Sequence, residues 1–280
     1  MKYRILLASL ALATPLLHAA SPETRDAGRK LSASHHESVV WLSVLAKTSM
    51  DAEGNVPAEV RAALAGQSTE AKSEITGTVI DASGLIVTAL KGMDKGSLLD
   101  GQTIQSGMGP IKLKASSEIK EIKVITSDGS EIPADLVLKD EDLGIAFIKV
   151  RSESDEAKGV TFHAIDLADS ASGEPLDDCI TLGRLDESLN RTSCILAGEI
   201  IAKAEKPRVI YRIDDDSVGC PIFLANGKLL GISVIPRTKN LADASGQMQI
   251  TPVVLPAADI AKVAAQAKEA PAPAAEAPTE

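Results

Sequence analysis

Short runs of apolar, often β-branched residues separated by polar turn residues dominate the chain. Clear examples are "SVVWLSVLA" at 38–46, "GIAFIKV" at 144–150 and "CITLGRL" at 179–185. Runs of this length and composition are typical of β-strands. Further runs of the same kind occur in "RTSCILAGEIIAKA" (191–204) and "RVIYRI" (208–213).

Three pairs of these runs are joined by turns that contain glycine. The turns fall at Ser83-Gly84, Asp128-Gly129 and Asn226-Gly227. An Asx-Gly pair between two apolar runs is the strongest short signal for a β-hairpin, because such turns need residues that tolerate a positive φ. Many short strands at close spacing predict an all-β barrel or sandwich and not βαβ units.

Helical patterns are confined to two segments. Residues 57–66 begin with Pro57 and stop at Gly66, which predicts a short helix within a long connection. Residues 256–268 begin with a proline and place Ile260, Val263 and Ala264 on one face. We expect this second segment to be a C-terminal helix that packs on the β-core.

The two ends of the chain differ from the rest. Residues 1–20 combine a basic start, an apolar run over 5–17 and small residues near 19–21, which predicts a signal peptide and export to the periplasm or outside the cell. The alternative is a membrane anchor, for which the run is short. Residues 21–36 are expected to be an N-terminal extension, and the Ala/Pro-rich residues 269–280 a disordered tail.

Composition excludes some function classes. The net charge is -10 and only 2% of the residues are aromatic, which argues against nucleic-acid binding. The cysteines Cys179, Cys194 and Cys220 match no metal motif, so no metal or cofactor is expected. In an oxidising compartment two of them could form a disulfide, or all could be buried thiols.

Four segments, in order, resemble the HtrA (Deg) group of trypsin-like serine proteases. They are "TGTVIDASGLIVTALKGM", "IKVITSDGSEIPADLVLKDEDLGIAFIKV", "SVGCPIFLANGKLLGISV" and "GQMQITPVVLPAADIAKVAAQ". The resemblance covers about 37–268. It implies two six-stranded antiparallel β-barrels, at about 37–152 and 160–255, followed by the helix 256–268. It also implies an active-site cleft between the barrels.

The resemblance places the catalytic triad on residues that cannot perform it. The general base falls on Lys91, the orienting acid on Gly144 and the nucleophile on Val218. The oxyanion loop falls on 216–218, and Cys220 replaces a family glycine. A valine has no lone pair to attack with, a glycine cannot orient a base, and a protonated lysine is an acid. We therefore expect an exported pseudoprotease that binds an extended peptide or an envelope protein.

Several alternatives remain open from the sequence. Ser217 with Lys91 as a buried base would give an active serine endopeptidase. Cys220 is a second candidate nucleophile, but no histidine is paired with it. The acidic run Asp214–Asp216 could either bind a cation or form a solvated turn. His35, His36 and His163 are not expected at the cleft. A structural envelope protein that assembles through its acidic surface and tail is a third class. The sequence predicts no membrane span after signal removal and leaves the oligomeric state open.

Overall fold

A computed structural model describes residues 20–54, 56–106, 109–236 and 251–270. The expected signal peptide up to residue 19, and the expected tail from residue 271, lie outside the described residues. Among the residues that are described, no helix is both long and apolar enough to span a membrane.

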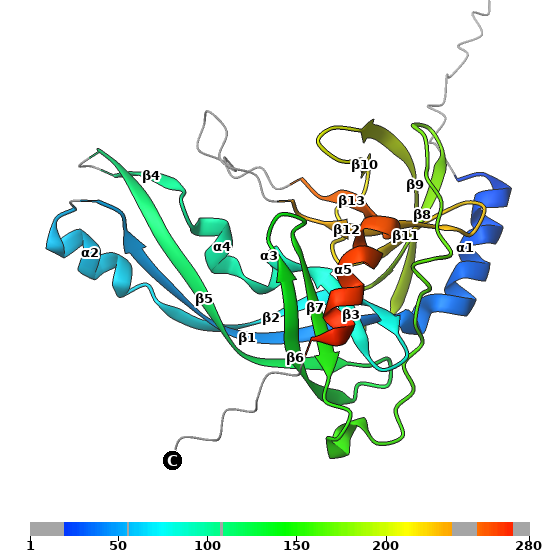
Figure 1. Cartoon of the computed structure of the whole chain (residues 1–280), viewed down its shortest axis with the longest axis horizontal. Helices are drawn as coiled ribbons and strands as arrows, with labels where there is room; N and C mark the ends of the chain where they lie inside the picture. Colours follow the sequence, from blue (N-terminus) through cyan, green and yellow to red (C-terminus); the bar gives the residue numbers. More distant parts are fainter. Residues whose placement is uncertain (1–19, 55, 107–108, 237–250, 271–280) are drawn as a thin grey trace, which may run out of the picture.

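The first β-barrel spans residues 39–150 and is closed by pairing of β1 (Val39–Ala52) with β5 (Gly109–Ile125) (Figure 1). Its six strands are β1 (Val39–Ala52), β2 (Thr69–Asp81), β3 (Leu85–Ala89), β5 (Gly109–Ile125), β6 (Glu131–Asp140) and β7 (Ile145–Val150). The spatial order is β1-β2-β3-β7-β6-β5, and every pairing is antiparallel. A short strand, β4 (Thr103–Ser106), pairs with the start of β5.

The second barrel spans residues 178–256. Its strands are β8 (Asp178–Arg184), β9 (Ser193–Ala204), β10 (Ile210–Ile213), β11 (Pro221–Leu224), β12 (Leu229–Val234) and β13 (Val253–Pro256). They close in the order β10-β13-β12-β11-β8-β9. Two six-stranded antiparallel barrels and a C-terminal helix confirm the fold class that the sequence predicts.

The three predicted hairpin turns lie where the glycine signals place them. Gly84, Gly129 and Gly227 have φ values of +78°, +86° and +86°. They connect β2 with β3, β5 with β6 and β11 with β12. A residue with a Cβ adopts this left-handed conformation only at a cost, which is why the glycines mark these turns so clearly.

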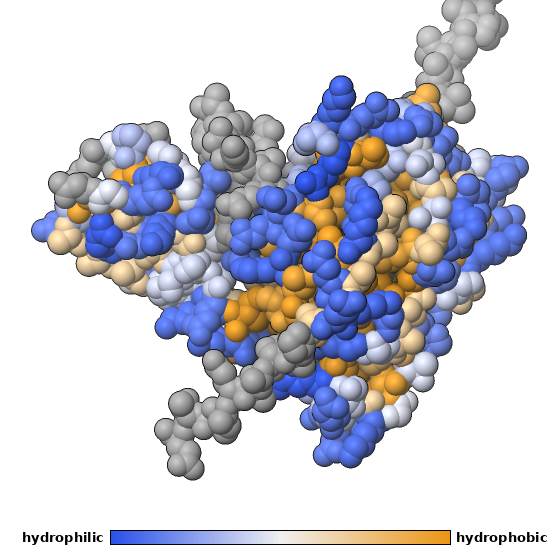
Figure 2. Space-filling model, in the orientation of Figure 1, coloured by the Kyte–Doolittle hydropathy of each residue, from blue (hydrophilic) through white to orange (hydrophobic). Residues whose placement is uncertain are grey.

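β1, β2 and β5 continue beyond the first barrel and form an arm. The arm carries helix α2 (Ala58–Ala65), as the Pro57 and Gly66 signals predict, and has its own small apolar cluster of Ala52, Leu64, Ile111 and Leu113. Figure 1 shows it projecting away from the two barrels. On the face shown in Figure 2, the strongly hydrophobic residues gather mainly over the barrels and not over the arm.

The extension at 21–36 contains a helix that the sequence reading missed. Helix α1 (Pro22–His35) begins at Ser21, whose hydroxyl accepts the Thr24 N–H at 3.1 Å. Gly28 lets the helix approach the second barrel, since a Cβ there would lie 3.3 Å from Ile195 Cγ2. A 3₁₀ turn, η1 (His36–Ser38), leads from α1 into β1.

The C-terminal helix α5 (Ala257–Glu269) covers the junction of the two barrels. Its residues Ile260, Ala264 and Ala267 are buried in an apolar cluster with side chains of both barrels, among them Phe147 and Ile232. Burial of this apolar face holds the barrels together. The remaining short helices are α3 (Leu90–Met93), α4 (Lys95–Leu99), η2 (Asp155–Ala157) and η3 (Glu187–Leu189).

Candidate active site

The segment 218–220 forms a tight corner that contacts both barrels. Gly219 has a φ of +78°, and its N–H donates to Ser233 O on β12 at 2.7 Å. From the first barrel, Thr78 Oγ1 donates to Gly219 O at 2.8 Å, and Thr76 Oγ1 donates to Val218 O. A Cβ on Gly219 would lie 2.1 Å from Thr76 O, so the corner requires glycine here.

The residue that the corner presents is Val218. Its side chain is half-buried and packs against the apolar cluster between the barrels. The position predicted for the nucleophile thus carries a hydrocarbon side chain in hydrophobic surroundings.

Lys91, at the position predicted for the base, lies in α3 and is only 6% exposed. Its Nζ donates a hydrogen bond to Pro236 O at 2.7 Å. Pro236 lies two residues after β12, so this hydrogen bond joins a side chain of the first barrel to a segment of the second barrel.

Gly144, at the position predicted for the orienting acid, lies next to α3. Its carbonyl accepts the Leu90 N–H at 2.9 Å, so Gly144 lies beside the residue that precedes Lys91. Gly144 has a φ of +71°, and a Cβ there would lie 2.4 Å from Ile235 O. The backbone at 235 and 236 therefore occupies space that an acidic side chain at 144 would need.

Arg212 contacts the segment that leads into the corner, where residues 216–218 are predicted to form the oxyanion loop. Arg212 Nη1 donates to the carbonyl oxygens of Ile213 at 2.5 Å and Asp215 at 3.2 Å. The Ser217 N–H donates to Asp215 Oδ1 at 2.8 Å, and Asp216, 90% exposed at its side chain, lies 3.7 Å from Arg212 Nη2. Among the described residues, Ser217 and Lys91 are not joined by a hydrogen bond.

The three cysteines are free thiols in the structure, and a disulfide among them stays a prediction. Burial raises the pKa of Cys179 and of Cys220 to about 12, and also raises that of Cys194. A thiol with such a pKa is protonated at neutral pH and is a poor nucleophile. Cys220 Sγ also donates weakly to Thr76 Oγ1 at 3.5 Å, which fits a structural role at the corner.

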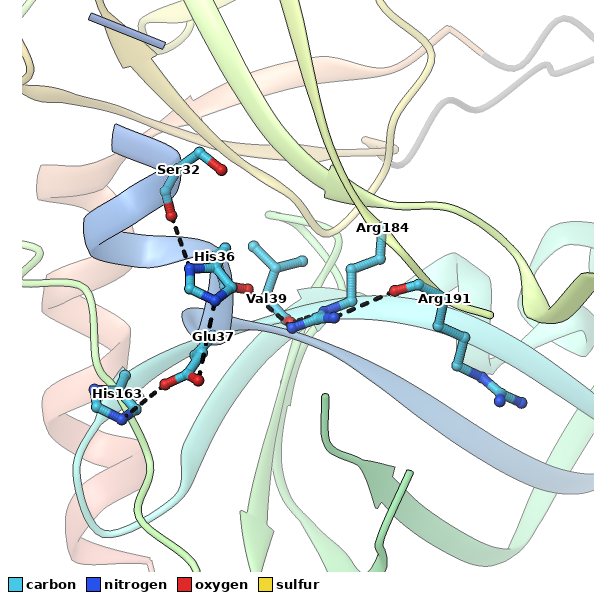
Figure 3. A network of polar contacts seen from close by, with 7 residues as sticks. All are labelled: Ser32, His36, Glu37, Val39, His163, Arg184 and Arg191. Atoms are coloured by element: carbon cyan, nitrogen blue, oxygen red, sulfur yellow. Dashed lines mark hydrogen bonds and ion pairs between the residues drawn. The ribbon is translucent and has the colours of Figure 1, made fainter. Parts of the chain in front are cut away.

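The histidines of the described chain make other contacts, and Figure 3 shows those of His36 and His163. His163 Nε2 lies 2.9 Å from Glu37 Oε2, and His36 Nδ1 lies 2.8 Å from Ser32 O. His35 stacks on Phe223 with ring centroids 5.4 Å apart, and burial lowers its pKa. Across the part of the chain that is described, no cluster of three His, Cys, Asp or Glu residues is placed to hold a metal ion.

Arg184 completes the network in Figure 3 and was not foreseen from the sequence. Its guanidinium donates to the carbonyl oxygens of His36 at 2.9 Å, Arg191 at 3.2 Å and Val39. These hydrogen bonds connect the start of β1 with the end of β8. The threonines of "TGT", 76–78, were also missed, although polar residues inside an apolar strand could have marked them as hydrogen-bonding positions.

Comparisons with known proteins agree with this architecture. Residues 75–232, more than half of the chain, match the family model described as trypsin-like peptidase domain. No curated protein matches the chain.

Solved structures with similar folds include three proteases. They are the HtrA-type protease AlgW with decapeptide (16% identity, 86% of this chain and 67% of that chain, TM-score 0.51), Deg5 (14%, 87% and 94%, TM-score 0.50) and the MamO protease domain from Magnetospirillum magneticum in its apo form (16%, 82% and 97%, TM-score 0.47). At these identities the AlgW and Deg5 structures show a shared fold. With the family match over the strands that form the corner and the junction of the barrels, the chain belongs to the trypsin-like peptidase domain family.

Proposed function

We propose that this protein is an exported, HtrA-type member of the family that does not cleave peptide bonds and instead binds an extended peptide or an envelope protein. One observation carries the proposal: the backbone at Ile235 and Pro236 contacts both the Lys91 amine and the site of the missing side chain at Gly144.

The chemistry at the corner supports this proposal. Acyl transfer in this fold needs a hydroxyl, a base that takes its proton and a carboxylate that orients the base. Val218, Lys91 and Gly144 supply none of these roles. Loss of a whole triad costs on the order of 10⁶ in turnover. The Ser217 N–H is already bonded to Asp215, so it is not directed towards a substrate.

A groove in the first barrel supports peptide binding. It has a volume of about 540 Å³, and one of the residues that line it is Leu90, which precedes Lys91 in the chain. It lies where β5 and β6 diverge: β6 pairs with β5 only up to Ala134 but with β7 as far as Asp140. An extended peptide could pair with the open edge of β6 by strand addition.

The groove has an apolar floor and a polar rim, as peptide-binding grooves have. Ile119, Ile122 and Leu136 lie on its floor, and the ion pair of Arg151 with Asp135 lies on its rim. Side chains of an added strand would point alternately to this floor and to solvent.

Burial of Lys91 favours one alternative, an active enzyme with Ser217 as nucleophile, because a buried lysine can lose its proton and act as a base.

Export is supported by the signal-peptide pattern of residues 1–20.

A single polypeptide probe, casein, tests both the absence of cleavage and the binding of an extended peptide. Purified protein without its signal peptide should leave casein, an unfolded polypeptide, intact over a day, and should bind fluorescein-labelled casein in an anisotropy titration. Leu136→Glu should weaken binding at least fivefold, and Leu176→Glu, at a 77% exposed leucine, should not. Casein cleavage that disappears in Ser217→Ala would establish the active enzyme instead.

A further inference from the structure

Two of the three cysteines lie on either side of Gly183 in the second barrel. On one side, Cys194 of β9 is the partner of Gly183 in the pairing of β8 with β9. On the other side, β11 pairs with β8 through Ile222 and Thr181, and the same antiparallel register places Cys220 beside Gly183. Both cysteines are therefore neighbours of one glycine, although they come from different strands.

The two sulfur atoms border the space that the missing side chain of Gly183 leaves open. A Cβ built on Gly183 would lie 3.1 Å from Cys194 Sγ and 3.8 Å from Cys220 Sγ. After the larger effect of burial, the Cys194 thiol helps to raise the pKa of Cys220. The third cysteine, Cys179, is separate from this pair, because its Sγ instead lies 4.0 Å from a Cβ built on Gly198.

A direct disulfide between Cys194 and Cys220 does not fit this arrangement without a shift of the backbone. Because β8 lies between their strands, we expect their Cα atoms to be about 9–10 Å apart, twice the spacing of neighbouring strands. A disulfide requires a Cα separation below about 7 Å. The two thiols are therefore joined more easily by an atom that lies between them.

A soft monovalent metal ion is the ligand class that fits two thiols. Thiolates select soft ions such as Cu(I), which is stably bound by two sulfur ligands, whereas Zn²⁺ takes four ligands in a closed site. Within the described ranges of the chain, no group of three His, Cys, Asp or Glu residues is placed to hold a metal ion. This ligand set therefore favours a two-coordinate ion.

The two thiols differ in their access to solvent. Cys194 is partly exposed, whereas Cys220 is 2% exposed. An ion can thus enter past Cys194 and be shielded from water beside Cys220. Burial raises the pKa of Cys194, and the positive charge of Arg184 opposes this effect. The same charge would offset the excess negative charge of two thiolates around a monovalent ion.

We propose that Cys194 and Cys220 bind one Cu(I) ion between their sulfur atoms, over Gly183. Binding releases both thiol protons to solvent and leaves the oxidation state of the copper unchanged. The site is independent of the peptide binding proposed above. Its ligands come from separate strands, which explains why the cysteine spacing in the sequence matches no metal motif.

Titration of the reduced protein without its signal peptide tests this inference, with Cu(I) as the probe, under nitrogen and in competition with the chromogenic chelator bicinchoninate. The wild-type protein should take one Cu(I) per chain from the chelator. Cys194→Ser and Cys220→Ser should each weaken binding at least hundredfold. Cys179→Ser, at a buried cysteine of the same barrel, should keep it. Circular dichroism shows whether each variant is folded, and Cys194→Ser, at a partly exposed residue, decides the test if Cys220→Ser is not.

A matched pair of glycine variants tests the geometry without removing a ligand. Gly183→Ala places a methyl group between the sulfur atoms and should weaken Cu(I) binding at least tenfold. Gly198→Ala, whose Cβ would have only Cys179 Sγ within 4.0 Å, should not. The inference is wrong if the wild-type protein takes no Cu(I) from the chelator, if binding survives Cys194→Ser, or if the two glycine variants bind equally well.

Discussion

The amine of Lys91 donates a hydrogen bond to the carbonyl oxygen of Pro236 at 2.7 Å. The two residues are 145 positions apart in the chain and belong to different barrels. In a trypsin-like protease the first of these positions holds the general base. Here it holds a buried lysine whose side chain connects α3 with the segment after β12. The position that the resemblance assigns to the general base thus makes a structural contact at the junction of the barrels.

Lys91→Met tests whether this contact stabilises the fold. The variant keeps most of the apolar volume but leaves the half-buried Pro236 carbonyl without its donor, so we expect the free energy of unfolding to fall by about 1–2 kcal/mol. Urea denaturation followed by circular dichroism measures the change. Lys158→Met, at a lysine that is 72% exposed, is the control and should stay within about 0.5 kcal/mol of wild type. A Lys91→Met variant as stable as wild type would show that the contact contributes nothing.

Gly144→Ala tests whether the acid position is sterically closed. Its Cβ would lie 2.4 Å from Ile235 O, and its φ is +71°. Gly129→Ala is a matched control, because Gly129 has a φ of +86° but nothing within 4 Å of an added Cβ. The control should cost about 1–2 kcal/mol for its backbone conformation, and Gly144→Ala about 1–3 kcal/mol more. Equal losses would mean that position 144 has room for a side chain.

Thr78→Val tests the attachment of the corner to the first barrel. Thr78 is fully buried and donates to Gly219 O at 2.8 Å. Removing its hydroxyl leaves a buried carbonyl unsatisfied, which costs about 1–3 kcal/mol. Thr192→Val removes an exposed hydroxyl that bonds Leu189 O at 2.7 Å and should change little. Thermal melting of the two variants compares them, and similar melting temperatures would contradict the role of Thr78.

The buried thiols predict an alkaline loss of stability. Burial raises the pKa of Cys179 and Cys220 from 9.0 to about 12 in the folded state. The unfolded chain releases these protons above pH 9, whereas the folded chain keeps them, so the contribution is complete below pH 9 and is lost as the pH rises towards 12. Urea midpoints between pH 8 and 10.5 should fall more steeply for wild type than for Cys179→Ala/Cys220→Ala. Parallel pH profiles would show that these thiols titrate normally.

Local signals were sufficient for much of the fold. The Asn226-Gly227 turn and the apolar runs on either side predict β11 and β12, because hairpin geometry depends on a few adjacent residues. Helix α1 was missed although Ser21 and Pro22 carry a start signal. It buries only Thr24, Gly28 and Leu31, so it lacks the apolar periodicity by which helices are recognised.

The candidate site was predictable in part. Alignment with the resembled segments named Lys91, Gly144 and Val218, and in the structure Gly144 O accepts the N–H of Leu90, which precedes Lys91. The contacts that give these residues new roles involve Ile235 and Pro236, more than 90 positions further along the chain. The placement of Cys194 and Cys220 beside Gly183 likewise depends on strands β8, β9 and β11, and no local pattern around either cysteine indicates it.

The account depends most on the absence of an activated serine at the corner. Intact-mass spectrometry after incubation with a fluorophosphonate, which labels activated serines, tests this directly, with trypsin as a positive control. We predict an unmodified protein under conditions that label trypsin completely. A single adduct on the wild-type protein, absent from Ser217→Ala, would contradict the account.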